Sequence, residues 1–212
     1  MLDGDDGETT DMRSRNKQAT RQAISLAALG LAIERGPGGL ALVRVTDIAA
    51  AAGVSPRTYN NYFSSREEAI CAFQADRARR LGRALRSRPA GEPLDQAVTA
   101  AVIEQFAVPE PDKAGLRMIM STPELEGEAL KAFTMAEGPL AEAIAERAGA
   151  DPGDLFPGVI AAAVAGAVRV AGRHWLVSGT TGAFAAVLRD ALASLLPAMR
   201  AAAPAPRRGS PA

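Results

Sequence analysis

The sequence predicts an all-helical fold with two helical domains, and three observations support this prediction. Apolar residues recur at helical spacing along most of the 212 residues. Clusters of glycine and proline divide the chain into segments of helix length, and no segment shows the apolar–polar alternation that is typical of strands. Aromatic residues make up only 4% of the chain, while alanine and leucine are abundant, which suits helices packed through small side chains.

The N-terminal part is predicted to contain an acidic tail and one helix. Residues 1–12 carry five acidic residues and no basic one, so we expect a disordered tail there. A helix is then predicted from Arg13 to Arg35, where the following apolar residues fall on one face: Ile24, Ala27, Ala28, Leu31 and Ala32. Glycine and proline at 36–39 end this helix.

Residues 45–70 contain the most informative motif. Thr46 is expected to cap a second helix, and Gly53 is expected to end it in the left-handed conformation. Ser55 then caps a third helix with Pro56 at its first position, where the missing N–H costs nothing. Two short helices joined by a turn of this length form a helix-turn-helix, whose second helix lies in the DNA major groove.

The remainder of the chain is predicted to be helical up to about residue 202. Ser65 is expected to cap a fourth helix that ends near Arg88. Proline and glycine then separate the further predicted helices, which span 94–107, 112–121, 123–148, 152–178 and 181–202. The last two are apolar on several faces and cannot expose all of them to water. Residues 203–212 are proline-rich and are predicted to be a second disordered tail.

The formal net charge is zero, but the charges are segregated along the chain. Residues 13–88 carry fourteen basic and five acidic residues, a net charge of +9, whereas residues 1–12 and 89–212 carry −5 and −4. A basic segment that coincides with a helix-turn-helix indicates a phosphate-binding surface. For the arginines between 77 and 88 alone, a solvated basic helix is the alternative interpretation.

The motif DIAAAAGVSPRTYNNYF, followed by SSREE, resembles the N-terminal DNA-binding domain of TetR-type transcriptional regulators, from about Arg15 to Ile70. Residues from Arg117 to Trp175 resemble the C-terminal domain of acyl-CoA-responsive or mycofactocin-type regulators. The resemblance implies a helix-turn-helix DNA-binding domain at 13–65 and a helical effector-binding and dimerisation domain at 66–202. It also implies a homodimer in which 155–178 and 181–202 form a four-helix bundle with their copies; a monomer core is the alternative.

The outward face of the third helix is predicted to read DNA. Tyr59 and Phe63 lie four residues apart and are expected to pack inward, which leaves Arg57, Asn60 and Asn61 facing outward. Arginine can bond guanine in two places, and asparagine can do the same with adenine. The full DNA-binding set implied by the resemblance is Thr46, Ser55, Pro56, Arg57, Thr58, Asn60, Asn61, Tyr62 and Arg66. Of these, we expect Thr46, Thr58, Tyr62 and Arg66 to meet phosphates.

The resemblance also implies an effector pocket in the second domain. Its candidate residues are Phe106, Arg117, Met118, Met120, Phe133, Met135, Arg169, Arg173 and Trp175. The arginines could meet an anionic group, although exposure to solvent is the alternative for each, and core packing is the alternative for the methionines. We therefore expect a mostly apolar or acyl-CoA-like effector.

Together these features predict a ligand-responsive transcriptional regulator, most simply a repressor that a small molecule releases from a palindromic operator. An architectural DNA-binding protein and a small helical enzyme are the alternatives. The sequence shows no catalytic set, no phosphate-binding loop and no zinc set around its single His174 and single Cys71, so we expect neither an enzyme, a metal nor a cofactor.

A cytoplasmic location without membrane contact is expected. One cysteine is typical of a reducing compartment, and the acidic N-terminus does not resemble a signal peptide. The longest apolar segment, 155–168, is shorter than a membrane span and is predicted to be a buried helix.

Overall fold

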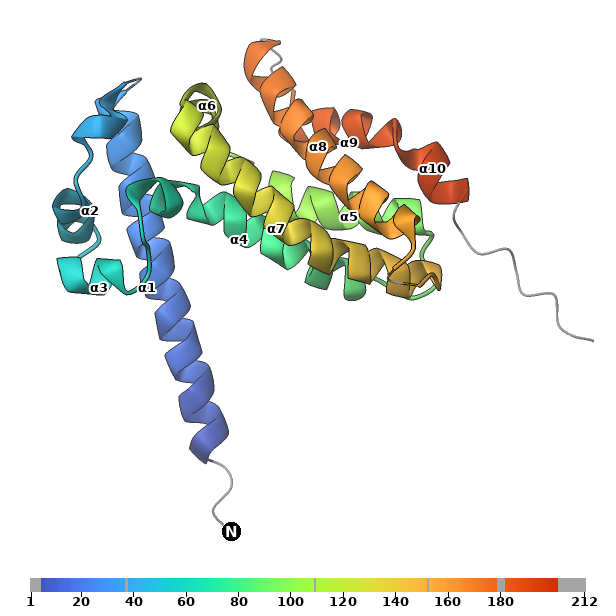
Figure 1. Cartoon of the computed structure of the whole chain (residues 1–212), viewed down its shortest axis with the longest axis horizontal. Coiled ribbons are helices and arrows are strands. Elements are labelled where there is room, and N and C mark those ends of the chain that lie inside the picture. The colour runs from blue at the N-terminus through green and yellow to red at the C-terminus, as the bar shows by residue number, and fades with distance from the viewer. Residues whose placement is uncertain (1–4, 37, 109, 152, 179–181, 202–212) are drawn as a thin grey trace, which may run out of the picture. The chain divides into compact units, whose positions relative to one another are not determined.

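The computed structural model describes residues 5–36, 38–108, 110–151, 153–178 and 182–201 (Figure 1). The elements in order are α1 (Asp5–Arg35), the 3₁₀ helix η1 (Gly39–Leu42), α2 (Val45–Ala51), α3 (Pro56–Asn60), α4 (Arg66–Arg86), α5 (Leu94–Ala107), α6 (Lys113–Ser121), α7 (Pro123–Ala148), α8 (Leu155–Val177), α9 (Phe184–Ala193) and α10 (Leu196–Ala201). The described residues form helices and no strand, which confirms the all-α prediction.

The chain divides into two compact units. The HTH unit comprises Met1–Phe73 and Met118–Glu128, and the bundle unit comprises Gln74–Arg117 and Ala129–Ala212. The first turns of α4 and the corner between α6 and α7 therefore belong with the helix-turn-helix, whereas the sequence suggested a boundary after residue 65. One contact inside the HTH unit is the buried Cys71 thiol, which donates to the Leu125 carbonyl at 3.4 Å.

The first helix is longer than predicted. It begins at Asp5 rather than Arg13, so it includes most of the predicted acidic tail, while residues 1–4 lie outside the described part of the chain. Residues 5–12 contain no proline, and adding residues to an existing helix costs far less than starting one. The C-terminal half of α1 is the packed half, because Ile24, Ala28 and Ala32 are fully buried.

The predicted helix at 181–202 is two helices, α9 and α10, separated at Ser194 and Leu195. Pro197 lies in the first turn of α10 and explains the break, because proline lacks an N–H and disfavours helical geometry in the residue before it. The predicted tail at 203–212 lies outside the described residues. The helices α5 and α7 match their predicted bounds.

In the bundle unit, α4 and α7 approach each other backbone to backbone. A Cβ atom placed on Gly82 would lie 2.7 Å from the carbonyl oxygen of Pro139. No side chain fits into that space, so glycine is required there for the two helices to pack at this separation. Around this crossing the core contains fully buried apolar side chains such as Leu85, Ile144 and Leu188.

The helix α8 is apolar on two faces. Among the described residues it is the one helix long and apolar enough to cross a membrane, but 39% of its most apolar window is buried inside the chain. Its buried face, which includes Ile160, Val164 and Val168, packs in the bundle core, as expected from the sequence. The opposite face leaves Leu155 and Val177 82% exposed.

Candidate nucleic-acid interface and effector site

The turn between α2 and α3 depends on Gly53. Its φ of 67° is left-handed, a conformation that glycine adopts without steric cost. The Gly53 N–H donates to the Ala50 carbonyl at 3.1 Å, and the Val54 N–H donates to the Ala49 carbonyl at 2.9 Å. This pair of hydrogen bonds ends α2 and turns the chain into α3, as predicted.

The start of α2 differs from the prediction. Arg44, not Thr46, is the N-cap residue, and no side-chain hydrogen bond caps this helix. The chain arrives at Arg44 in an extended conformation, and Val45 is already helical, so Thr46 lies within the first turn. Its side chain is exposed there, where it remains available to a ligand.

The helix α3 is held by a cap at its start and by a buried tyrosine. The Thr58 N–H donates to the Ser55 hydroxyl at 3.0 Å, and Pro56 follows Ser55 at the first helical position, as predicted. Tyr59 is fully buried, and its hydroxyl donates to the Ser65 carbonyl at 2.8 Å. Burial, together with nearby carboxylates, raises the pKa of Tyr59 to about 12. The Phe63 ring packs 5.9 Å from the Tyr59 ring.

Because these two aromatic rings face inward, the opposite face of α3 is open to solvent. Arg57, Asn60 and Asn61 are exposed, as the sequence predicted. The other predicted DNA-binding residues lie in the same unit, between α2 and the first residue of α4. Thr46, Ser55 and Pro56 are exposed, and Thr58, Tyr62 and Arg66 are partly buried. The structure therefore brings all nine into the HTH unit.

Arg66 has an internal partner that the sequence did not reveal. Its Nη1 donates to the carbonyls of Ala41 and Val43 at 3.3 and 3.2 Å, and its Nε donates to the Glu67 carboxylate at 2.8 Å. Burial opposes the ionisation of Glu67, but its hydrogen bonds and the charge of Arg66 together outweigh burial, and the pKa of Glu67 is lowered. Arg66 thus holds the chain that precedes α2 against the start of α4.

The start of α4 is capped as predicted. The Glu68 N–H donates to the Ser65 hydroxyl at 3.0 Å, and the Glu68 carboxylate accepts bonds from the N–H and hydroxyl of Ser64 at 2.9 and 2.8 Å. These reciprocal bonds satisfy backbone donors that a helix start leaves unpaired. They also place Ser65, whose carbonyl holds the Tyr59 hydroxyl.

The bundle unit contains a narrow apolar void between α4, α5, α7 and α8. The stacked rings of Phe106 and Phe133, with centroids 5.9 Å apart, form one side. The void totals about 280 Å³ including its open mouth, yet its interior has room for about one water molecule. Glu137 is the one ionisable residue among the described lining residues. Four alanines contribute to the lining: Ala78, Ala136, Ala161 and Ala165.

Of the nine predicted effector residues, Phe106 and Phe133 line this void and the other seven do not. Trp175 is buried in the core of the bundle unit, where its indole N–H donates to the Gly182 carbonyl at 3.0 Å and the centre of its ring lies 5.2 Å from that of Phe184. Met118 is buried in the HTH unit, Met120 and Arg169 are partly buried, and Arg117, Met135 and Arg173 are exposed.

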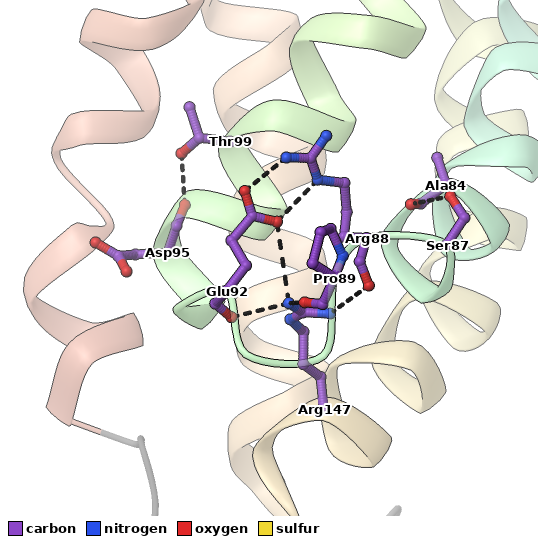
Figure 2. Close-up of polar contacts among 8 residues, drawn as sticks. All are labelled: Ala84, Ser87, Arg88, Pro89, Glu92, Asp95, Thr99 and Arg147. Atoms are coloured by element: carbon purple, nitrogen blue, oxygen red, sulfur yellow. Dashed lines mark hydrogen bonds and ion pairs between the residues drawn. The ribbon is translucent and has the colours of Figure 1, made fainter.

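A polar cluster fixes the turn between α4 and α5 (Figure 2). The Arg147 guanidinium, near the end of α7, donates to the carbonyls of Arg88, Pro89 and Glu92. The Glu92 carboxylate accepts two bonds from Arg88, at 2.8 and 2.6 Å, which lower the pKa of Glu92. Next to it, Arg86 donates to Glu146 at 2.7 and 2.8 Å. The C-terminal end of α4 is therefore tied to α7.

A helix-turn-helix with an exposed reading face, followed by a helical bundle around an apolar void, defines a helix-turn-helix transcriptional regulator. Comparison with known proteins identifies the family. Residues 92–200 match the family model of the MftR C-terminal domain, one of the TetR-type C-terminal domains. The chain is 34% identical over 200 residues to the HTH-type transcriptional regulator TcmR of Streptomyces glaucescens, covering 88% of this chain and 87% of that one.

Two further similarities agree with this assignment. A protein of Mycobacterium tuberculosis, MftR, assigned to the regulation of mycofactocin biosynthesis, is 27% identical over 166 residues, which cover 76% of this chain and 82% of that one. The TetR-family repressor FadR of Thermus thermophilus, solved in complex with lauroyl-CoA, has a similar fold with a TM-score of 0.54 and 21% identity, covering 91% of this chain and 99% of that one. The chain belongs to the TetR family, whose members are transcriptional regulators and not enzymes.

Arg66→Ala should destabilise the protein by about 1–3 kcal/mol, because the Ala41 and Val43 carbonyls lose a charged donor. Urea unfolding followed by circular dichroism measures this change. Arg57→Ala is the matched control: Arg57 is exposed on α3, so its removal should leave the free energy of unfolding unchanged. An Arg66→Ala protein as stable as the wild type would show that the internal bonds contribute nothing, leaving DNA contact as the role of Arg66.

Proposed function

We propose that this chain is a repressor that binds a palindromic operator as a homodimer and is released from it by a small apolar molecule. One observation carries the DNA-binding part: Tyr59 is fully buried, and this leaves Arg57 and Asn60 of α3, and Asn61 directly after it, exposed to solvent. The net charge of +9 over residues 13–88 supports it, because DNA binding depends strongly on phosphate neutralisation. In line with the family, we place the protein in the cytoplasm.

The roles of the exposed residues follow from their chemistry. Arg57 is suited to a bidentate bond with guanine, and Asn60 or Asn61 to one with adenine. Thr46, Thr58 and Tyr62 would position the helix on phosphates, which adds affinity without sequence preference. A palindromic site follows from a twofold dimer, whose recognition helices must lie about 34–36 Å apart to enter successive major grooves.

Arg57→Ala should weaken operator binding by about 1–3 kcal/mol and relax base preference at one position of each half-site. Gel shifts at several salt concentrations, with the region upstream of its own gene against random DNA, measure both effects. The matched control is Arg35→Ala. It removes one positive charge from an exposed residue at the C-terminal end of α1 and should have little effect on DNA binding. Equal binding of operator and random DNA by the wild type would instead favour the architectural alternative.

The proposed dimer interface is the outward face of α8 together with α9 and α10. Leu155, Val159, Val170 and Val177 are all at least half exposed in the single chain, and they recur at helical spacing along that face. Exposed apolar residues aligned in this way mark a protein–protein contact. Leu192 and Val164 are fully buried within their own chain, so they belong to its core rather than to this interface. Covering this face with a second subunit also accounts for the apolar character of α8 without a membrane.

Val170→Arg should convert the dimer to a monomer, because a charge would be buried at the interface without a partner. Light scattering should show the mass fall from about twice the chain mass to the chain mass while the helical circular dichroism remains. Leu130→Arg is the matched control, since Leu130 is 46% exposed on α7, which is not part of the proposed interface. A wild-type monomer at micromolar concentration would contradict the proposed dimer.

The proposed effector site is the void lined by Phe106 and Phe133. Its lining of alanines and valines suits an apolar group, and the helices must separate to admit one, because the interior is so narrow. The lauroyl-CoA bound by the FadR of Thermus thermophilus makes acyl-CoA the first probe. Release would follow from a preference of the effector for a dimer shape that does not fit the operator, and a coupling of about 1–3 kcal/mol would weaken operator binding about 5–150-fold.

Ala165→Leu should abolish the response to the effector and leave operator affinity within about twofold, because the larger side chain fills the void without touching α3. Fatty acids, acyl-CoAs, and aromatic and cationic compounds are first screened by thermal shift, and each hit is then titrated into an operator complex observed by fluorescence anisotropy. Ala114→Leu, on the exposed surface of α6, is the control. Hits that raise the melting temperature but never release the operator would contradict the proposed switch.

A further inference from the structure

We propose that the N-terminal half of α1 is a second DNA-contacting element, in which Arg13 and Lys17 bind phosphates that flank the bases read by α3. This inference rests on the proposed DNA-binding function, but it concerns a surface outside the helix-turn-helix. The partner of this surface is the phosphate backbone of duplex DNA.

The helix α1 is much longer than its packing requires. It spans 31 residues, yet the first fully buried side chain among its described residues is Ile24. Arg13, Asn16, Lys17 and Gln18 are all exposed. Figure 1 shows this half of α1 continuing as a single helix past α2 and α3, which belong to the same unit. This half of α1 therefore presents polar and basic side chains that its own unit does not cover.

Arg21 fixes the direction of this extension relative to α3. Its Nη1 donates to the Tyr62 carbonyl at 3.1 Å, and its guanidinium lies 4.3 Å from the centre of the Phe63 ring. The face of α1 that carries Arg21 is therefore turned toward the end of the recognition helix. Lys17 lies one turn earlier on that face and Arg13 two turns earlier, at about 6 and 12 Å along the axis.

The charge of this segment matches DNA. Residues 13–33 contain four basic residues and no acidic one, whereas residues 1–12 carry a net charge of −5. Lys17 lies one helical turn before Arg21, which contacts the carbonyl of Tyr62, and Tyr62 is itself a proposed phosphate contact. The acidic residues before Arg13 would be repelled by phosphate and set the outer limit of the contact.

Phosphate contacts have a signature that separates them from base reading. They add affinity and salt dependence, with a slope of about 0.9 per phosphate in a plot of log K against log salt concentration, and they carry no sequence preference. A contact about 12 Å beyond the recognition helix also requires about four additional base pairs of duplex, at 3.4 Å per base pair. The inference therefore predicts that binding depends on the length of the flanking DNA.

The test uses the full-length chain and the double variant Arg13→Gln with Lys17→Gln. The probes are two duplexes that carry the site protected by the wild type upstream of its own gene, one trimmed to that site and one longer by about six base pairs at each end. The wild type should bind the longer duplex more tightly. The double variant should lose that gain, of the order of tenfold at 0.1 M salt, and its salt slope should be lower by about 0.9 for each phosphate that it no longer binds.

Two controls separate charge from structure. Arg35→Gln removes a basic residue from the other end of α1 and should bind as the wild type. The swap Arg13→Lys with Lys17→Arg keeps both charges and should retain the gain from flanking DNA. A double variant with the wild-type salt slope and length dependence would overturn this inference while leaving the proposed function intact. A wild-type chain that protects no DNA site would overturn both.

Discussion

The candidate DNA-reading surface depends on the burial of one side chain, Tyr59. Its ring occupies the interior of the HTH unit, and its hydroxyl donates to the Ser65 carbonyl, so the end of α3 is bound to the start of α4. An α3 of five residues has little stability of its own, and its orientation comes from this contact and from the cap at Ser55. Ser65 is itself placed by the cap of α4. The packing of Tyr59 on the inner face of α3 therefore determines which residues its outer face exposes.

A second set of contacts limits how the bundle unit can change shape. The end of α4 is tied to α7 through Arg86 and through the Arg147 cluster, and at Gly82 the two helices touch along their backbones. The contact at Gly82 lies next to the void, because Leu81 and Leu140, the neighbours of Gly82 and Pro139, line it. Room for a ligand is therefore easier to create toward α5 and α8 than between α4 and α7. In the proposed mechanism, a movement of α8 on effector binding would also shift the dimer interface that α8 forms, and so change the dimer shape.

The sequence was sufficient where structure is decided within a few residues. Gly53, Ser55 and Ser65 act on backbone groups no more than four residues away, and their roles were predicted correctly. The inward placement of Tyr59 and Phe63 followed from helical spacing. The break between α9 and α10 at Ser194 and Leu195 was missed because apolar periodicity continues through it.

Long-range contacts could not be predicted in this way. Arg66 binds backbone carbonyls 23 and 25 residues away in the sequence, and Arg21 binds one 41 residues away. Because every residue has a backbone carbonyl, the sequence does not indicate which of them an arginine will contact. Most predicted effector residues fell outside the void for a related reason: residue size marked the methionines and Trp175, whereas the space is created by alanines.

The single thiol leads to a practical consequence. Cys71 is buried against Leu125, so it should react slowly with maleimides in the native state, and a cysteine introduced at an exposed position could carry a fluorescent or spin label without removing the native one.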